Sequence, residues 1–133
     1  MTIPIEERVA IAELISLHGH LTDAGELDRY DEVFSSDVVY DLSDFELGEM
    51  NGIPAMQDAA RALGAANPVG HHVTNMILDE AAGGVVHARS KGIGIMADGT
   101  AGSVVYDDVI ERQQGAWRIR RRRVARRRRP LGA

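Results

Sequence analysis

The residues that could do chemistry in this chain are histidines, carboxylates, tyrosines, serines and arginines, because the sequence contains no cysteine. That absence excludes disulfides, thiolate nucleophiles and the usual structural zinc sites. The most informative group is an adjacent pair, His71 and His72, together with the carboxylate of Asp23. A carboxylate bonded to one ring nitrogen of a histidine fixes its tautomer and makes the other nitrogen a good base near neutral pH. The candidate chemistry is therefore proton transfer.

Only one of the two adjacent histidines can face a pocket. Residues 71–79 are typical of a β-strand, in which successive side chains point to opposite faces. His72 then shares a face with Thr74 and Met76, and His71 lies on the other face. From chemistry alone the alternatives stay open, because Asp23 can make a local turn contact and a histidine can be a hydrogen-bonded core residue.

Two tyrosines and a second carboxylate are further candidates. Tyr40 and Tyr106 could each donate a hydrogen bond to a substrate carbonyl or enolate, or be buried and satisfied by the backbone. Asp108 shares a strand face with Tyr106 and would bring a second carboxylate toward the pocket. Its alternative role is an ion pair with an arginine of the last strand, such as Arg121 or Arg123.

Other motifs argue against metal, phosphate and acyl-transfer chemistry. His18 and His20 are two positions apart on a predicted helix and point to different faces, so they do not form a metal pair. The segment 92–94 (Gly-Ile-Gly) lies inside a strand and no helix follows it, so it indicates a bend in the sheet. The sequence has no nucleophile elbow and no metal-ligand spacing. We expect no cofactor and no metal.

The composition fits one globular domain. The chain has 133 residues, of which 44% are hydrophobic and 26% are charged, and both values are ordinary for a folded domain. No segment approaches ~18 consecutive apolar residues, and Glu6 and Glu7 stand where a secretory signal would be basic. We therefore expect a cytoplasmic protein with no membrane partner.

The charge is divided unevenly along the chain. Nine of the fifteen basic residues lie between positions 118 and 129, whereas all twenty acidic residues precede position 118. Such a block is typical of a solvated arm. Nucleic-acid binding is not expected, because the rest of the chain lacks a basic face with stacking aromatics. We expect Arg121 and Arg123 to pair with acidic side chains, and residues 126–129 to form a mobile arm that the pocket does not need.

The periodicity predicts helices first and then a sheet. The predicted elements are a helix from about Pro4 to Ala24, a short helix within 26–35, strands at 37–42 and 45–50, a helix from Pro54 to about Leu63, and strands at 71–79, 85–96, 102–112 and 117–124. The last four strands form an antiparallel meander, with a strong hairpin signal at Asp98-Gly99. This order indicates an α+β fold, with the helices packed on one face of a curved sheet.

Four motifs resemble those of a known family: LDRYDEVFSSDVVYD (27–41), GHHVTN (70–75), YDDVIER (106–112) and GAWRIR (115–120). They are similar to the SnoaL-like branch of the nuclear transport factor 2-like superfamily, over about Pro4 to Val124. The resemblance implies a cystatin-like α+β barrel, a cone-shaped antiparallel sheet wrapped by N-terminal helices, with a deep apolar pocket. It implies one SnoaL-like domain over residues 1–125 and an Arg-rich tail over 126–133.

The resemblance also suggests which residues act. In scytalone dehydratase and the hexachlorocyclohexane dehydrochlorinase, an aspartate late in the first helix pairs with a histidine that opens a strand, and these positions match Asp23 and His72. The dyad that the resemblance implies is Asp23 and His72, and the residue chemistry and strand faces described above make Tyr40, Tyr106, Asp108 and Met76 the expected substrate-binding residues. Other dehydratase positions differ: Thr22 replaces a tyrosine, Ile95 a histidine, and Val104 and Tyr106 a serine and an asparagine. A different substrate is therefore expected.

The function that this resemblance implies is a cofactor-independent enzyme of the lyase or isomerase and cyclase type, acting on a cyclic or polyketide-like small molecule. The superfamily also has non-catalytic members, so a small-ligand-binding protein or an assembly protein is the alternative. A homodimer through the outer sheet face is expected as well, with Val105 and Val109 in the contact.

Overall fold

The computed structural model describes residues 2–132, and its elements follow the predicted order. They are helix α1 (Ile5–Asp23), the 3-10 helix η1 (Leu27–Glu32), strand β1 (Phe34–Asp41), η2 (Ser43–Phe45), β2 (Glu49–Asn51), helix α2 (Ile53–Leu63), η3 (Gly64–Ala66), β3 (Gly70–Glu80), η4 (Ala82–Gly84), β4 (Val86–Ile95), β5 (Ala101–Gln113), β6 (Ala116–Arg126) and η5 (Pro130–Gly132). The short second helix is a 3-10 helix, and the predicted strand at 45–50 shrinks to three residues.

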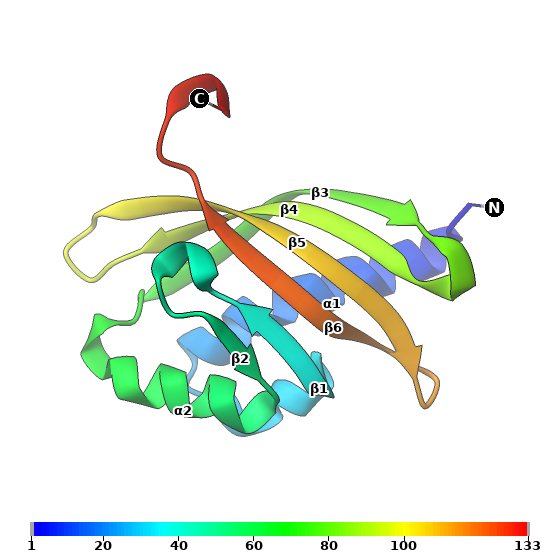
Figure 1. The fold of residues 1–133 in the computed structure, drawn as a ribbon, viewed down its shortest axis with the longest axis horizontal. Coiled ribbons are helices and arrows are strands. Elements are labelled where there is room, and N and C mark those ends of the chain that lie inside the picture. Colours follow the sequence, from blue (N-terminus) through cyan, green and yellow to red (C-terminus); the bar gives the residue numbers. More distant parts are fainter. Residues whose placement is uncertain (1, 133) are drawn as a thin grey trace.

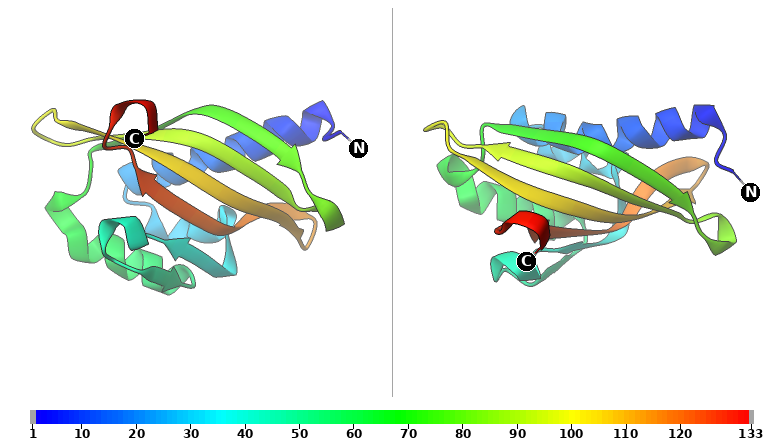
Figure 2. Two further views of the ribbon diagram at one scale, coloured as in Figure 1. Left: turned by 45° about the horizontal axis from the view of Figure 1, so that its top comes forward. Right: turned by 90° about the horizontal axis from the view of Figure 1, so that it is seen from above.

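The six strands form one curved sheet in the order β2-β1-β6-β5-β4-β3. Strands β3 to β6 make the predicted antiparallel meander, whereas β1 runs parallel to β6. The sheet is therefore mixed and not purely antiparallel, because the chain passes through α2 and the whole meander before β6 returns beside β1. Helix α1 lies across one face of the bent sheet, and α2 lies beside β1 (Figure 1; Figure 2). The α+β, cystatin-like fold class is confirmed.

Helix α1 covers the sheet with an apolar stripe that contains one histidine. Pro4 precedes its first residue, and Glu6 and Glu7 lie in its first turn, where the helix dipole favours negative charge. Its buried residues recur every three or four positions: Ile11, Leu14, Ile15, His18 and Leu21. The helix therefore brings His18 into the interior along with the core.

Strand β3 changes face partway along its length. Its pairing with β4 shifts between Thr74 and Ile77, and Asn75 has a left-handed φ of 55°. A β-bulge of this kind adds one residue to one strand and resets the alternation of its side chains. Val73 and Met76 consequently pack against the same core, although simple alternation puts them on opposite faces.

Strand β6 carries a second irregularity, and it decides which arginine is buried. Ile110 pairs with Ile119 whereas Val109 pairs with Arg121, so Arg120 is the extra residue. After this shift Arg122 follows Ile119 on the inner face and is only 1% exposed. A bulge thus places one member of a polyarginine run in the core.

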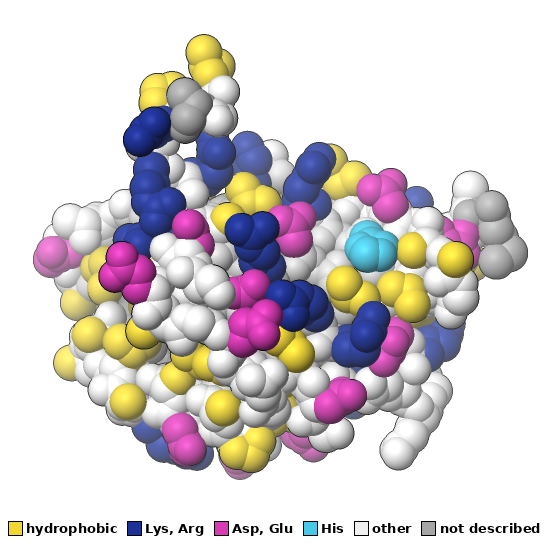
Figure 3. All heavy atoms as spheres, viewed as in Figure 1, with side chains coloured by type: hydrophobic (Ala, Val, Ile, Leu, Met, Phe, Trp, Pro, Cys, Tyr) yellow, Lys and Arg dark blue, Asp and Glu magenta, His cyan; other side chains and the backbone are white. Residues whose placement is uncertain are grey.

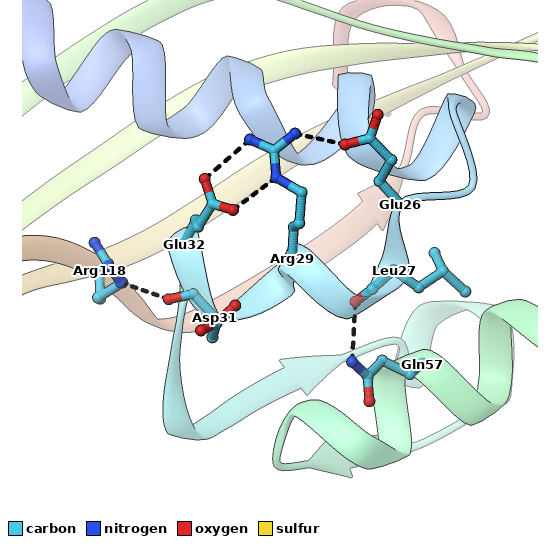
Figure 4. Close-up of polar contacts among 7 residues, drawn as sticks. All are labelled: Glu26, Leu27, Arg29, Asp31, Glu32, Gln57 and Arg118. Atoms are coloured by element: carbon cyan, nitrogen blue, oxygen red, sulfur yellow. Dashed lines mark hydrogen bonds and ion pairs between the residues drawn. The ribbon is translucent and has the colours of Figure 1, made fainter.

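The short helix η1 is tied to its neighbours by the polar contacts of Figure 4. Arg29 lies between Glu26 and Glu32 and forms an ion pair with each. The backbone carbonyl of Leu27 accepts a hydrogen bond from the Gln57 side chain of α2 at 2.9 Å. Together with a bond from Arg118 to the Asp31 carbonyl, drawn in the same figure, these contacts hold η1 in place between α2 and β6.

Within residues 2–132, no helix combines the length and the apolar character needed to cross a membrane.

Candidate active site

A cavity with a volume of about 750 Å³ lies between α1, α2 and the concave face of the sheet. Its walls are mostly apolar, with Met50 and Met56 among the lining side chains. Six polar side chains of the lining come from five elements: His18, Thr22, Tyr30, Tyr40, His71 and Tyr106. A largely apolar pocket with a few convergent polar groups is typical of a small-molecule site.

His71, on the cavity wall, is paired with Asp23. Asp23 is the last residue of α1, and His71 is the second residue of β3. The Nδ1 atom of His71 lies 2.6 Å from Oδ1 of Asp23, and the backbone N–H of His71 donates to Oδ2 at 3.0 Å. The carboxylate therefore fixes both the ring and the backbone of the histidine.

The expected pairing of Asp23 with His72 is wrong: the structure places His71 at the carboxylate and on the cavity wall. His72 is exposed, and its Nε2 stands over Gly70. The choice between the two faces is made by α1, because Gly19 lies against the backbone and Cβ of His71. A Cβ at Gly19 would approach the His71 carbonyl oxygen to 2.9 Å, so glycine permits this close contact.

The Asp23–His71 pair is arranged for general base chemistry. Because Nδ1 is occupied by the carboxylate, Nε2 is the ring nitrogen available to a ligand in the cavity. The side chains are 28% and 23% exposed, so a proton on the imidazole would meet a partly desolvated carboxylate. Such a carboxylate stabilises the imidazolium that forms when the base accepts a proton.

A network of polar side chains extends from the buried core to the cavity. Arg122 forms a bidentate ion pair with Asp108, at 2.7 and 2.9 Å. Its Nη1 donates to Nδ1 of His18 at 3.0 Å, and its guanidinium lies over the Tyr106 ring, 4.4 Å from the centroid. Asp108 therefore pairs with Arg122 and with neither Arg121 nor Arg123. It belongs to the core, 2% exposed, and the expectation that it binds substrate is wrong.

The pKa values of the side chains in and beside this network follow from burial and neighbouring charge. Burial opposes the charge of Arg122, but the Asp108 carboxylate holds the pKa of the guanidinium above its usual value. Burial and then the adjacent Arg122 lower the pKa of His18 well below the ordinary value of 6.5. Burial raises the pKa of Tyr40 and of Tyr106. At neutral pH His18 is thus uncharged, and both tyrosines keep their protons.

Of the other expected substrate-binding residues, two lie in the cavity and one does not. Tyr40 and Tyr106 line it, as expected. Met76 packs against the hydrophobic core and does not line the cavity; the bulge at Asn75 turns it onto the inner face shared by His71 and Val73, so its position farther along β3 keeps it out of the cavity. The expectation for Met76 is therefore wrong.

The C-terminal arginines are closer to the cavity than expected. Arg126 and Arg127 line it, so residues 126–129 do not stand apart from the pocket. The backbone N–H of Arg126 donates to Asp44 at 2.6 Å, and Arg128 forms an ion pair with the same carboxylate. Arg121 pairs with two acidic residues, as expected: Asp41 and Glu49. Basic side chains follow this segment, with acidic ones beside them (Figure 3).

Sequence reasoning missed His18 and Arg122 as site residues. The signal for His18 was its place in the apolar stripe of α1, where a histidine must find a buried partner. Arg122 gave no such signal, since its burial depends on the bulge at Arg120. In the part of the chain that the structure describes, no group of three or more metal-ligating side chains comes together.

The family is shown by a match of residues 4–123 to the model of the SnoaL-like domain. The chain therefore belongs to the SnoaL-like family of the nuclear transport factor 2-like superfamily. Among curated proteins, none matches this sequence.

Three solved structures with the same fold are informative. A protein from Novosphingobium aromaticivorans assigned as an aromatic ring hydroxylase is 26% identical, with a TM-score of 0.80 over 96% of this chain and 94% of that one. A second protein from the same organism, assigned as a scytalone dehydratase, is 18% identical, with a TM-score of 0.76 over 93% of this chain and 86% of that one. The hexachlorocyclohexane dehydrochlorinase LinA-type3 from Novosphingobium barchaimii is also 18% identical (TM-score 0.78; 93% and 88% covered). The fold is thus one with enzymes among its neighbours.

Proposed function

We propose that the protein is a cofactor-independent enzyme in which His71, oriented by Asp23, moves a proton on a small cyclic substrate held in the apolar cavity. The observation that carries the proposal is the 2.6 Å contact between His71 Nδ1 and Asp23 Oδ1 at the cavity wall. The reaction class is dehydration, isomerisation or cyclisation, each of which begins with proton removal from a weakly acidic carbon or hydroxyl.

The cavity suits a substrate of this kind. A volume of about 750 Å³ holds a molecule of two or three fused rings, and its mostly apolar wall would exclude water around the reacting carbon. His71 is one of the few polar side chains on a mostly apolar wall, so the ring system of a substrate would contact apolar side chains while its reacting position meets the base. The likeness to the dehydratase and dehydrochlorinase structures supports lyase-type chemistry as a class.

The proposal is tested by proton exchange, which needs no knowledge of the natural substrate. Wild-type protein in deuterium oxide should speed deuterium incorporation next to the carbonyl of a bicyclic ketone such as 2-tetralone, followed by proton NMR. His71→Gln removes the base and should lower the exchange rate by roughly a hundredfold or more, within the range that general bases contribute. Asp23→Asn should also slow exchange, because an amide can stabilise the wrong imidazole tautomer.

His72→Gln is the matched control, since it changes the neighbouring histidine on the exposed face of the same strand. It should leave the exchange rate within about twofold of wild type, as expected for a surface change. If His72→Gln abolishes exchange and His71→Gln does not, the assignment of the base is wrong. If the wild type binds ring compounds without exchanging protons, the alternative of a ligand-binding protein is favoured.

A further inference from the structure

His18 faces the same cavity as His71 but is bound in the opposite way. Its partner is the guanidinium of Arg122, with Nη1 and Nδ1 3.0 Å apart. A guanidinium has only N–H donors, so Nδ1 of His18 must accept this bond through its lone pair. The single ring proton is then on Nε2, and His18 is a fixed hydrogen-bond donor.

The surroundings of His18 keep it uncharged. A second ring proton would sit on Nδ1 and meet the N–H of Arg122, whose position is fixed by the bidentate pair with Asp108. The other groups against the ring are His71 from β3 and three aromatic rings from η1 and β1, which approach edge to face: Tyr30, Phe34 and Tyr40. None of these groups carries a negative charge that would stabilise an imidazolium.

Within residues 2–132, the Nε2 atom of His18 has no hydrogen-bond partner. His18 is 9% exposed and lines the cavity, and among residues 2–132 its one polar side-chain contact is Arg122. The Tyr30 hydroxyl is committed elsewhere: Thr22 donates to the His18 carbonyl at 2.8 Å, so the 2.6 Å contact makes Tyr30 the donor to Thr22. Nε2 is not among the enclosed, unpaired side-chain atoms of the described residues, and His18 lines the cavity, so a ligand oxygen there can accept its hydrogen bond.

We propose that the Nε2–H of His18 is the donor that binds the substrate's oxygen, where negative charge develops as His71 removes a proton. The inference rests on the proposed function and narrows its substrate to ketones or phenol-like compounds with an oxygen conjugated to the reacting position. In the step, the C–H bond next to a carbonyl breaks and its proton passes to His71. The electron pair forms a carbon–carbon double bond, and the carbonyl π pair moves to the oxygen that His18 binds.

Two residues that are both histidines thereby have opposite tasks. Asp23 gives His71 a negatively charged partner and makes it a base, whereas Arg122 gives His18 a positively charged partner and makes it a donor. A preorganised neutral donor in a water-poor site stabilises an oxyanion without transferring its proton. The enolate stays anionic until His71 returns the proton to another carbon or a leaving group departs.

The test is a binding comparison that does not depend on turnover. Para-nitrophenolate and nitrobenzene have similar shapes, but only the first presents an anionic oxygen, and calorimetry gives the dissociation constant of each. Wild type should prefer the phenolate at a pH where the phenol is fully ionised in solution. His18→Phe keeps a ring but loses the donor, so it should reduce that preference by roughly ten- to a hundredfold, as for loss of a charge-assisted hydrogen bond.

His18→Gln is the conservative variant, because its amide can accept from Arg122 and still donate to the ligand; it should retain most of the preference. Tyr40→Phe tests a competing donor on the same wall. An unchanged preference in His18→Phe would overturn the inference, as would a wild type with no preference. If His18→Phe weakens both ligands, His18→Gln decides: retained preference supports the inference and lost preference overturns it. Failure of ketone exchange with an intact phenolate preference would count against the proposed base alone.

Discussion

At the scale of single residues, the site depends on which partner each histidine meets. The sequence places His71 and His72 side by side, and alternation shows that only one can reach a pocket, but nothing in the strand itself says which. The face is selected by α1, through the close approach of Gly19 to His71. The identity of Asp23 as a partner is thus predictable from the sequence, and the identity of the histidine is not.

The neutral state of His18 makes a prediction about stability against pH. Because the pKa of His18 is low in the folded protein, the unfolded chain takes up a proton here below about pH 6.5, and the folded protein does not. The contribution of His18 to stability is therefore complete above that pH. Below that pH the free energy of unfolding should fall by up to about 1.4 kcal/mol per pH unit, because the unfolded chain binds one proton more than the folded protein.

Urea unfolding at several pH values between neutral and mildly acidic measures this dependence, with His18→Gln as the comparison. As the pH is lowered, the free energy of unfolding of the variant should fall less steeply than that of the wild type. Asp41 and Asp44 have lowered pKa values, because of hydrogen bonds from Ser43 and from the Arg126 backbone respectively. Their contributions are lost only at more acidic pH, below about 4, so they do not obscure the comparison. Equal slopes in both proteins would contradict a buried neutral His18.

At the scale of elements, the regular features follow from local sequence and the irregular ones do not. Pro4 and the apolar stripe predict α1, and Asp98-Gly99 predicts the β4–β5 hairpin, where Asp98 accepts hydrogen bonds from Thr100 and Gly99 has a φ of 86°. The bulges at Asn75 and Arg120 depend on pairing with the neighbouring strands, so no local sequence pattern predicts them. The bulge at Arg120 accounts for the pairing of Asp108 with Arg122, and the bulge at Asn75 explains why Met76 faces the core although His72 is exposed.

The bulge at Asn75 can be tested directly, because its left-handed φ of 55° suits asparagine and glycine but not a β-branched residue. Asn75→Val should lower the free energy of unfolding by about 1–2 kcal/mol, the cost of forcing such a residue into this conformation. Asn75→Gly should change it by less than about half of that, since glycine adopts this φ freely. Urea titrations of the three proteins give the comparison. A stable Asn75→Val protein would show that β3 can pair without the bulge.

At the scale of the whole molecule, the outer face of the sheet mixes apolar and charged side chains, with Ile77 and Val109 beside Arg89 and Asp107. The outer face of the sheet carries exposed Ile77 and Ile93, with Val105 and Val109 half-buried beside them. This is the face through which a homodimer is expected, and the pairing stays a prediction. The excess of basic charge lies at the end of β6 and in the tail that follows it (Figure 3).

The tail meets the rest of the molecule chiefly at one carboxylate. Asp44 accepts the Arg126 backbone N–H, and it pairs with Arg128, whose side chain is 50% exposed. Arg126 also lies over the Phe45 ring, 4.7 Å from its centroid, and lines the cavity together with Arg127. Exposed ion pairs contribute little to stability, but cations at a cavity wall can act on a charged ligand without contributing to the fold.

Truncation after Ala125 should therefore separate folding from binding. The free energy of unfolding in urea should change by less than about 1 kcal/mol, because the lost pairs are exposed. The affinity for an anionic ring compound such as 2-naphthoate should fall by roughly two- to fivefold, the value of a solvent-screened charge contact, while that for neutral 2-acetylnaphthalene should hold. Gel shifts of both proteins with DNA and RNA at two salt concentrations complete the comparison. Tight binding to nucleic acid that disappears on truncation would instead make the arginines a nucleic-acid contact, since phosphate binding by such a segment weakens steeply with salt.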